Sequence, residues 1–315
     1  MHSAVAAKVD EMVKVTPTNS QAVDNNEEYR NVAERIVKAI STRQYSQVAS
    51  CFTLDGLERY NKLIAYGTGR IVGSPELQFF HSVKNKVVVR GLQMSFSFLN
   101  AQKKRVSFVE DVVLTLNDSK KVENVSFGLG AVAEKDILTK YAPGWRDDTR
   151  ELLMEFLENY KTAYCLKDTA FIRAVFDDDA IIIVGNVVKK PMTALQGEKR
   201  ITIEGQNIIK YNRYTKSEYM DHLNYAFKRN EFINVKFNKS DVKMMSKYYN
   251  KENNFQEIFG IQLGQEYSSS RYADVGYLFL LVNMTNHDEP LINVRTWQPN
   301  EVDTEKLFNA GDFYK

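Results

Sequence analysis

Apolar residues recur at helical spacing in two places along the chain. In the first, Val32, Ile36 and Ile40 predict a helix over residues 26–41. In the second, a longer apolar stripe predicts a helix over residues 147–166, and the stripe consists of Leu152, Leu153, Phe156, Tyr160, Ala163 and Tyr164. Shorter helical patterns cover residues 45–52, 54–66, 134–141 and 168–176, and a capping box of Thr215 and Glu218 begins a helix over residues 215–228.

Between and after these helices, apolar and polar residues alternate, which is typical of strands with one buried face. The predicted strands cover residues 86–99, 105–116, 121–127, 179–185, 197–214, 232–248, 255–267, 272–284 and 291–297. Residues 117–120 predict a tight turn between two of them. The alternation indicates antiparallel sheets that cover a layer of helices, so the predicted fold class is α+β.

The order of the elements repeats along the chain. Residues 39–56 and 163–180 align without a gap at the constant offset 163 − 39 = 124. The aligned pairs include Ala39 with Ala163, Arg43 with Lys167, Val48 with Ile172, Phe52 with Phe176 and Asp55 with Asp179. The repeat predicts a duplicated domain. The predicted divisions are a polar tail over residues 1–25, a first domain over 26–130, a linker over 131–146 that contains Pro143 and Gly144, and a second domain over 147–315.

Composition narrows the range of functions. The 42 basic and 40 acidic residues leave a net charge of +2 without a run of five like charges, which argues against a nucleic-acid partner. Cys51 and Cys165 are too few for a disulfide framework, and we expect two buried thiols. The 4 histidines lack the spacing of metal ligands, so neither a metal nor another cofactor is expected. No stretch approaches the ~20 apolar residues of a membrane span.

The N-terminal residues leave the cellular compartment open. Residues 1–25 are polar and lack the basic flank and apolar run of a secretion signal. A polar linker at the start of a chain would suit a protein whose upstream segment has been removed. In that case the cell envelope is favoured over the cytoplasm.

The second half resembles the nuclear transport factor 2-like cone fold, the superfamily that includes ketosteroid isomerase and the SnoaL-like proteins. The resemblance covers residues 147–300 and is carried by Tyr160, the turn Lys167-Asp168, Phe176 with Asp178-Asp179-Ala180, and the final VRTWQP. The first half resembles the fold more faintly. The resemblance implies two tandem cone-fold domains, each with N-terminal helices packed on a strongly curved antiparallel sheet around a pocket.

The resemblance also implies where catalytic groups would stand. In ketosteroid isomerase a tyrosine of the first helix donates a hydrogen bond to the developing enolate oxygen, and Tyr160 matches that position. The general base of that family falls on Val184, which cannot accept a proton. In the first half the two corresponding positions are Ile36 and Tyr60. Neither repeat therefore carries the donor and the base together.

The missing base leaves two functions open. The first is a non-catalytic ligand-binding or protein-assembly module, which binds a small apolar ligand or a protein and could form a homodimer through the sheet face. The alternative is a SnoaL-type isomerase, dehydratase or hydrolase that acts in the second domain, with Tyr160 as donor and a recruited base such as Glu204 or His222. The residues expected to line the ligand pocket or an interface are Tyr160, Tyr164, Val184, Tyr277, Phe279 and Trp297.

Overall fold

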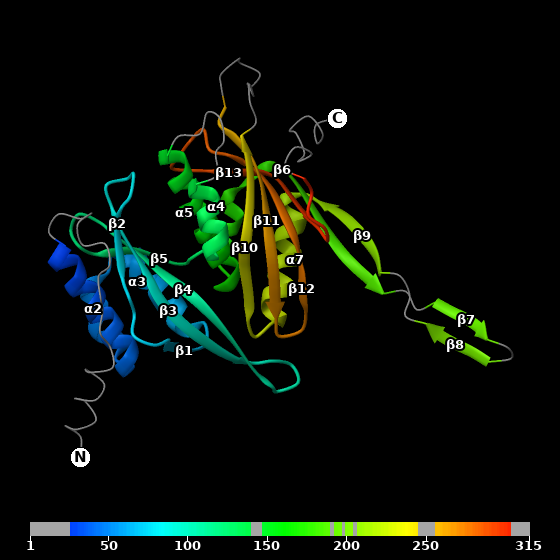
Figure 1. Cartoon of the computed structure of the whole chain (residues 1–315), viewed down its shortest axis with the longest axis horizontal. Helices are drawn as coiled ribbons and strands as arrows, with labels where there is room; N and C mark the ends of the chain where they lie inside the picture. Colours follow the sequence, from blue (N-terminus) through cyan, green and yellow to red (C-terminus); the bar gives the residue numbers. More distant parts are fainter. Residues whose placement is uncertain are drawn as a thin grey trace.

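The computed structural model describes residues 26–139, 147–189, 192–196, 199–203, 207–244 and 256–303. Over these residues the chain forms two large sheets with helices packed between and against them (Figure 1). This mixture of separate sheets and helices confirms the predicted α+β class. In the described part of the chain, no helix combines the length and the apolar composition needed to cross a bilayer.

The first half begins with helices and continues as a sheet. The helices are α2 (Asn26–Thr42), the 3-10 helix η2 (Tyr45–Cys51) and α3 (Leu54–Ala65). The strands are β1 (Thr68–Ile71), β2 (Gln78–His81), β3 (Val87–Leu99), β4 (Arg105–Leu116) and β5 (Val122–Phe127), in the order β1-β3-β4-β5, with β2 also paired to β3. All these pairs are antiparallel. β1 and β2 are absent from the sequence prediction because four residues are too few to display a period of two.

The helices of the first half meet the sheet through one apolar face. Ile36 and Ile40 of α2 are buried, as their helical spacing predicts, and Val32 is half-buried against the same core. The close approach of α3 to β5 depends on Gly56, because a Cβ at this position would lie 2.1 Å from the Val122 carbonyl oxygen. A glycine at the start of α3 therefore sets how closely this helix approaches the edge of the sheet.

A bulge in β3 controls which side chains face which side of the first sheet. The register with β4 shifts between Val89 and Leu92, and Gly91 adopts a φ of +89° at the shift. A Cβ on Gly91 would lie 2.2 Å from the Glu76 carbonyl oxygen. The extra residue lets Val89 and Leu92 both point into the core, while Arg90 contacts α5, a helix of the second half.

The second half contains the larger sheet. Its helices are α4 (Ala131–Thr139), α5 (Asp147–Cys165), α6 (Thr169–Val175) and α7 (Lys216–Arg229). Its strands are β6 (Phe176–Lys189), β9 (Asn207–Tyr214), β10 (Ile233–Met244), β11 (Ile258–Ser269), β12 (Ala273–Asn283) and β13 (Leu291–Gln298), in the order β10-β11-β12-β13-β6-β9. β7 (Met192–Gln196) and β8 (Lys199–Ile203) form a separate pair. The capping box of Thr215 and Glu218 at the start of α7 is confirmed.

Two details of this sheet differ from the prediction. β13 and β6 are parallel neighbours, so the sheet is mixed rather than purely antiparallel. The segment predicted as a single strand over residues 197–214 forms β8 and β9, which pair with different partners. Alternation is a local signal, and it carries no information about the direction or identity of the neighbouring strand.

α4 and α5 lie between the two sheets (Figure 1). α4 fills most of the segment predicted as a linker and buries Ala133 and Ile137. α5 packs against the C-terminal end of β5, where the amide of Phe127 donates a hydrogen bond to Thr162 Oγ1 at 2.7 Å. One buried apolar cluster runs from Tyr29 in α2 to Ile292 in β13. Pro143 and Gly144, the predicted boundary, lie outside the described residues.

Candidate functional site

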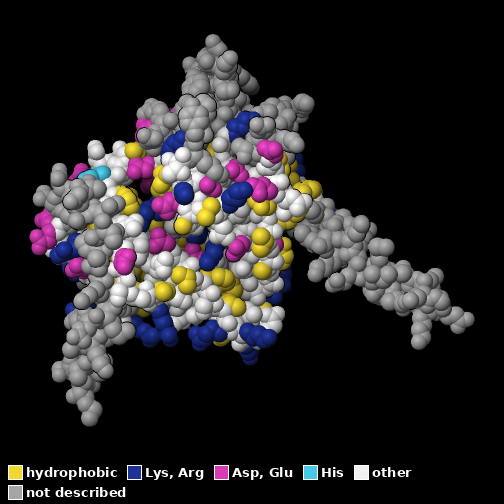
Figure 2. Space-filling model, in the orientation of Figure 1, with side chains coloured by type: hydrophobic (Ala, Val, Ile, Leu, Met, Phe, Trp, Pro, Cys, Tyr) yellow, Lys and Arg dark blue, Asp and Glu magenta, His cyan; other side chains and the backbone are white. Residues whose placement is uncertain are grey.

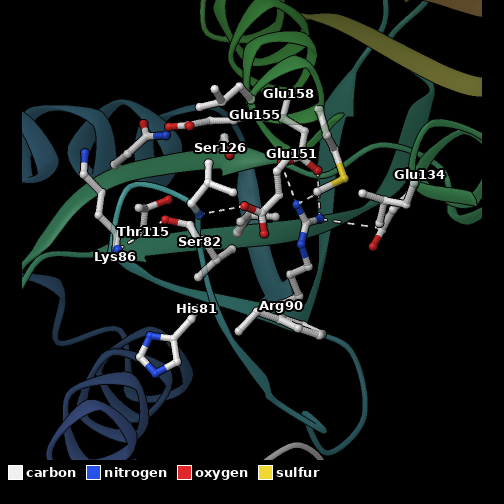
Figure 3. A pocket seen from close by; sticks show the side chains of 18 residues that line it. His81, Ser82, Lys86, Arg90, Thr115, Ser126, Glu134, Glu151, Glu155 and Glu158 are labelled. Atoms are coloured by element: carbon white, nitrogen blue, oxygen red, sulfur yellow. Dashed lines mark hydrogen bonds and ion pairs between the residues drawn. The ribbon is translucent and has the colours of Figure 1, made fainter. Parts of the chain in front are cut away.

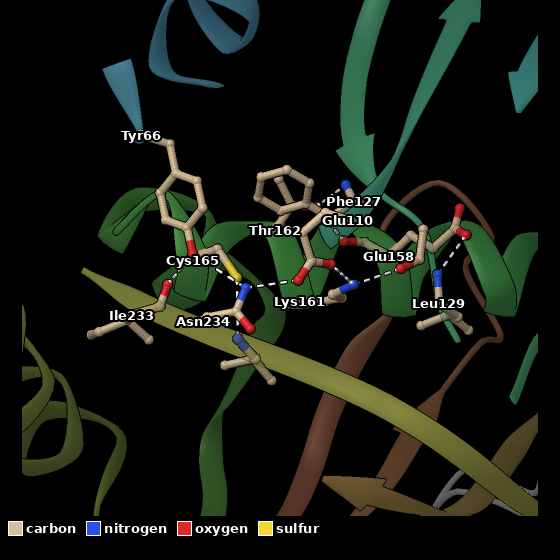
Figure 4. A network of polar contacts seen from close by, with 12 residues as sticks. Tyr66, Glu110, Phe127, Leu129, Glu158, Lys161, Thr162, Cys165, Ile233 and Asn234 are labelled. Carbon is tan, nitrogen blue, oxygen red and sulfur yellow. Dashed lines mark hydrogen bonds and ion pairs between the residues drawn. The ribbon is translucent and has the colours of Figure 1, made fainter. Parts of the chain in front are cut away.

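Two buried ion pairs fasten α5 to the first sheet. Lys161 Nζ lies 2.7 Å from Glu110 Oε2, and both side chains are almost fully buried. Arg90 donates two hydrogen bonds to the carboxylate of Glu158, at 2.8 and 2.9 Å. Glu110 also accepts a hydrogen bond from Asn234 at 2.7 Å, which extends the network to β10 (Figure 4). Since each of these charges has a hydrogen-bonded partner, the network holds the two halves together.

Beside this network a groove of about 310 Å³ opens between α5 and strands β2 to β5. Its walls are mainly apolar, and the apolar side chains include Phe80, Val88, Val113, Leu138, Leu152 and Met154. In Figure 3 the carboxylates of Glu151, Glu155 and Glu158 come from α5 on one side, and Thr115 and Ser126 lie on the strands opposite. An apolar hollow of this size with a few convergent polar groups has the typical composition of a small-molecule site.

The tip of the β2–β3 hairpin is held in place as one wall of the groove. The amide of Val83 donates to Glu151 Oε2 at 2.7 Å, which ties the hairpin to α5. Lys84 Nζ lies 3.2 Å from Asp288 Oδ1 in the turn before β13. The hairpin of the first half is therefore anchored to two elements of the second half, and the groove exists only where the two halves meet.

The polar side chains of the groove without a hydrogen-bond partner among the described residues include Glu155, Thr115 and Ser126. The two hydroxyl-bearing residues are buried in the floor, with exposed fractions of 5% and 3%. Glu155 is half-buried and lines a second hollow of about 480 Å³, whose other lining residues include Phe171 and His287. Unpaired polar groups in apolar surroundings are unfavourable. These three side chains can therefore form additional hydrogen bonds with a ligand that enters the groove.

Burial raises the pKa of three carboxyl groups in and behind the groove. The pKa of Glu155 is raised by burial, and the nearby Lys84 and Lys86 offset only part of this effect. The pKa of Glu134, on the wall beside Arg90, is raised by burial too. Behind the groove, burial raises the pKa of Asp111 to about 6. These directions indicate a water-poor environment, in which a hydrogen bond to a carboxylate is stronger than at the surface.

The tyrosines singled out by the sequence lie inside the second half. Tyr160 and Tyr164 are buried, and their hydroxyls share a hydrogen bond of 3.1 Å. The Tyr164 hydroxyl shares a second one, of 2.5 Å, with Tyr219 of α7. Val184 is half-buried against the same core, and the Trp297 ring packs over the adjacent Gly185. The structure therefore brings Tyr160 and Tyr164 into one hydroxyl chain, with Val184 and Trp297 on the inner face of the sheet.

The remaining predicted site residues lie elsewhere. Phe279 is buried in a separate cluster on the opposite face of the sheet, and Tyr277 shares that face, since alternate residues of a strand point the same way. His222 is exposed on α7, where its ring lies 4.7 Å from that of Tyr214. Glu204 lies outside the described residues. None of the predicted site residues lines the groove described above.

The sequence contains one signal that points to the groove. Glu151, Glu155 and Glu158 stand at positions i, i+4 and i+7 of α5, on the side away from the apolar stripe. A row of acids on a helix is usually solvated, and only the tertiary structure places this row against a sheet. Across the described residues, no group of three His, Cys, Asp or Glu side chains is arranged to hold a metal ion.

Surface charge adds no second site on the face drawn in Figure 2. Lys and Arg side chains gather along its lower edge, near the β3–β4 hairpin, while both signs mix over the centre. The exposed basic residues at the tip of that hairpin are Lys103, Lys104 and Arg105. They form a hairpin tip rather than an extended basic stripe.

Comparison of the sequence with protein-family models finds no match, and comparison with curated proteins finds none either. Two solved structures are weakly similar. Bd1075 from Bdellovibrio bacteriovorus matches 50% of this chain and 42% of its own at 15% identity, with a TM-score of 0.33. Naphthalene 1,2-dioxygenase with indole bound in the active site matches 51% of this chain and 83% of its own at 9% identity, with a TM-score of 0.32. The chain thus spans less than half the length of Bd1075, and at these TM-scores neither match identifies a fold family.

Proposed function

We propose that this chain is a non-catalytic binding protein whose site is the groove between α5 and the first sheet. The observation that carries the proposal is Glu155, a half-buried carboxylate without a hydrogen-bond partner among the described residues, at the meeting point of two hollows. Thr115 and Ser126 add two unpaired hydroxyls on the opposite wall. A site of this kind gains affinity from a ligand that supplies the missing donors.

The lining also indicates the chemical class of the ligand. Arg90 is paired with Glu158 and lies 3.6 Å from Glu134, so its charge is already neutralised. Lys86 is paired with Glu123. Among the described residues of the groove, the carboxylates of Glu155 and Glu151 are left without an ion pair, and Glu151 already accepts a hydrogen bond from the Val83 amide. These two negative charges favour a cationic donor. We infer a small ligand with an apolar body and a protonated amine.

The alternative enzyme of SnoaL type stays a prediction, as does membership of the nuclear transport factor 2-like superfamily. The Tyr160 hydroxyl is bonded to Tyr164 rather than to an acid or a histidine. The aligned base position remains Val184. A binding role requires no base, and it therefore agrees with both observations.

The test is a comparison of three probes of equal size, benzylamine, benzyl alcohol and benzoate, by NMR titration of the full chain. We expect benzylamine to bind most tightly, with chemical shift changes at residues of the groove. Replacement Glu155→Gln removes the charge and keeps the shape, and we expect about tenfold weaker binding of benzylamine. Glu58→Gln, at an exposed position of α3, is the matched control and should leave the affinity unchanged. Equal binding of all three probes, or shifts confined to other surfaces, would contradict the proposal.

A further inference from the structure

Arg295 is a buried cation on the inner face of the second sheet. It lies in β13, and only 9% of its surface is exposed. Its guanidinium lies 5.3 Å from the centre of the Tyr219 ring. An arginine stays charged at all pH values relevant to proteins. The interior of the second half therefore contains a permanent positive charge.

The N–H groups of this cation are not all used. Arg295 Nε and Nη1 are both buried without a hydrogen-bond partner among the described residues. Two residues further along β13, Trp297 Nε1 is likewise buried and unpartnered. Because residues i and i+2 of a strand share a face, these donors belong to the same side of the sheet. Buried donors are normally satisfied, so several unpaired ones together indicate a missing acceptor.

Neighbouring groups do not supply the missing negative charge. Burial raises the pKa of Tyr160 to about 12 and that of Tyr164 well above the usual value, so both phenols are neutral at pH 7. Among the described residues, Asp274 interacts electrostatically with Arg295 but forms no ion pair with it. Its Oδ2 accepts from the Tyr272 hydroxyl at 2.8 Å, and its Oδ1 is buried without a hydrogen-bond partner, so it does not reach the guanidinium. Burying an unpaired charge costs several kcal/mol in a protein interior.

The site is held in shape from two sides. A Cβ on Gly276 would lie 2.7 Å from Nε1 of Trp297, and one on Gly185 would lie 2.4 Å from its ring. These glycines of β12 and β6 allow the indole to lie flat on the sheet beside Arg295. On the other side, the hydroxyl chain through Tyr160, Tyr164 and Tyr219 fixes three polar groups relative to one another.

We propose that Arg295 anchors an anion-binding site inside the second half, which takes a small carboxylate or the carboxylate end of a larger ligand. The guanidinium supplies charge-assisted hydrogen bonds, and the indole N–H of Trp297 supplies a further donor. The site is separate from the groove, whose unpaired group is a carboxylate and whose ligand is a cation. It does not depend on the function proposed for the groove.

The first test measures thermal unfolding of the full chain in sodium acetate, with acetamide as the neutral isostere and sodium chloride at matched ionic strength. Increasing acetate concentration should raise the Tm up to a saturating value, whereas acetamide and chloride should leave the Tm unchanged. Arg295→Gln should weaken the response to acetate about tenfold or more. Arg150→Gln is the matched control, since Arg150 is a buried arginine whose Nη1 donates to the Ile137 carbonyl oxygen, and it should keep the response. Equal responses to acetate and acetamide, or an undiminished response in Arg295→Gln, would overturn the proposal.

Two further measurements keep the proposal testable if Arg295→Gln does not fold. In the wild-type chain, acetate should shift an arginine Nε–H resonance in ¹⁵N spectra together with the indole N–H of Trp297, and acetamide should not. A buried arginine without its anionic ligand lowers the stability of the ligand-free protein, because its charge is unpaired. Arg295→Met should therefore have an unchanged or higher Tm when no anion is added. A lower Tm for Arg295→Met, or unmoved resonances, would assign Arg295 a purely structural role.

Discussion

Arg43 and Lys167 hold the same left-handed backbone conformation at the ends of two helices, with φ values of 59° and 58°. The offset 167 − 43 = 124 is that of the sequence repeat. In both places the following amide donates to the carbonyl oxygen of the aligned alanines, Ala39 at 2.8 Å and Ala163 at 2.7 Å. The aligned segments therefore share a helix cap in detail, although they share few identical residues.

The first prediction concerns this cap. A non-glycine residue in the left-handed region is strained by about 1 kcal/mol, and Arg43 makes no described side-chain contact that would offset the strain. Arg43→Gly should therefore raise the free energy of unfolding by about 0.5 kcal/mol. Lys167→Gly should gain less, because Lys167 Nζ donates to the Asn230 carbonyl oxygen at 2.5 Å. Urea denaturation of both variants measures the difference, and Lys38→Gly, inside α2, should instead be destabilised. Destabilisation of Arg43→Gly would show that the arginine side chain stabilises the cap.

The second prediction concerns the ion pair between Lys161 and Glu110. Removing one partner leaves the other as a buried, unpaired charge, so Lys161→Met should lower the free energy of unfolding by about 3–5 kcal/mol. The double variant Lys161→Met/Glu110→Leu should recover part of this loss, because it removes both charges. Denaturant titration of the single and double variants provides the comparison. A double variant that is less stable than the single one would mean that Asn234, which donates to Glu110, is the more important partner.

The third prediction concerns pH. The pKa of Asp111 is raised by burial from 3.8 to about 6 in the folded protein. The folded state then binds a proton more readily than the unfolded chain, so this group makes the free energy of unfolding fall as the pH rises from about 4 to about 6. Asp111→Asn should remove that slope and raise the free energy of unfolding at pH 7 by about 2 kcal/mol. Asp118→Asn, at an exposed turn, should keep the wild-type slope. If Asp111→Asn and the wild type show the same pH dependence of the free energy of unfolding, other carboxyl groups cause that dependence.

The fourth prediction concerns the bulge at Gly91. A methyl group there meets the Glu76 carbonyl oxygen at 2.2 Å, and a φ of +89° is unfavourable for alanine. Gly91→Ala should lower the free energy of unfolding by about 2 kcal/mol or more. Gly73→Ala is a matched control with positive φ but no atom within 4 Å, so it should lose about 1 kcal/mol. Equal losses in the two variants would mean that the backbone near Glu76 moves aside.

Much of the local structure could be predicted from the sequence because its signals are local. The apolar stripe that contains Tyr160 predicts α5 to within one residue at its C-terminal end, and Thr215 with Glu218 predicts the cap of α7. The parallel pairing of β13 with β6 could not be predicted in this way, since neighbours in a sheet are chosen by long-range packing. Long-range packing also explains a second difference. The sequence analysis assigns Phe279 and Trp297 to one pocket or interface, but in the sheet they lie on opposite faces.

The α+β class and most helices and strands follow from local sequence patterns, because the spacing of apolar residues reflects the geometry of each element. The positions of the unpaired polar groups that could bind a ligand follow instead from tertiary packing. Glu155 and Thr115 face each other across the groove only because α5 of one half lies against the sheet of the other. Arg295 has unpaired donors only because folding removes it from water without bringing a carboxylate into contact. Both properties depend on which distant residues meet and which polar atoms remain without partners, and a linear pattern contains neither.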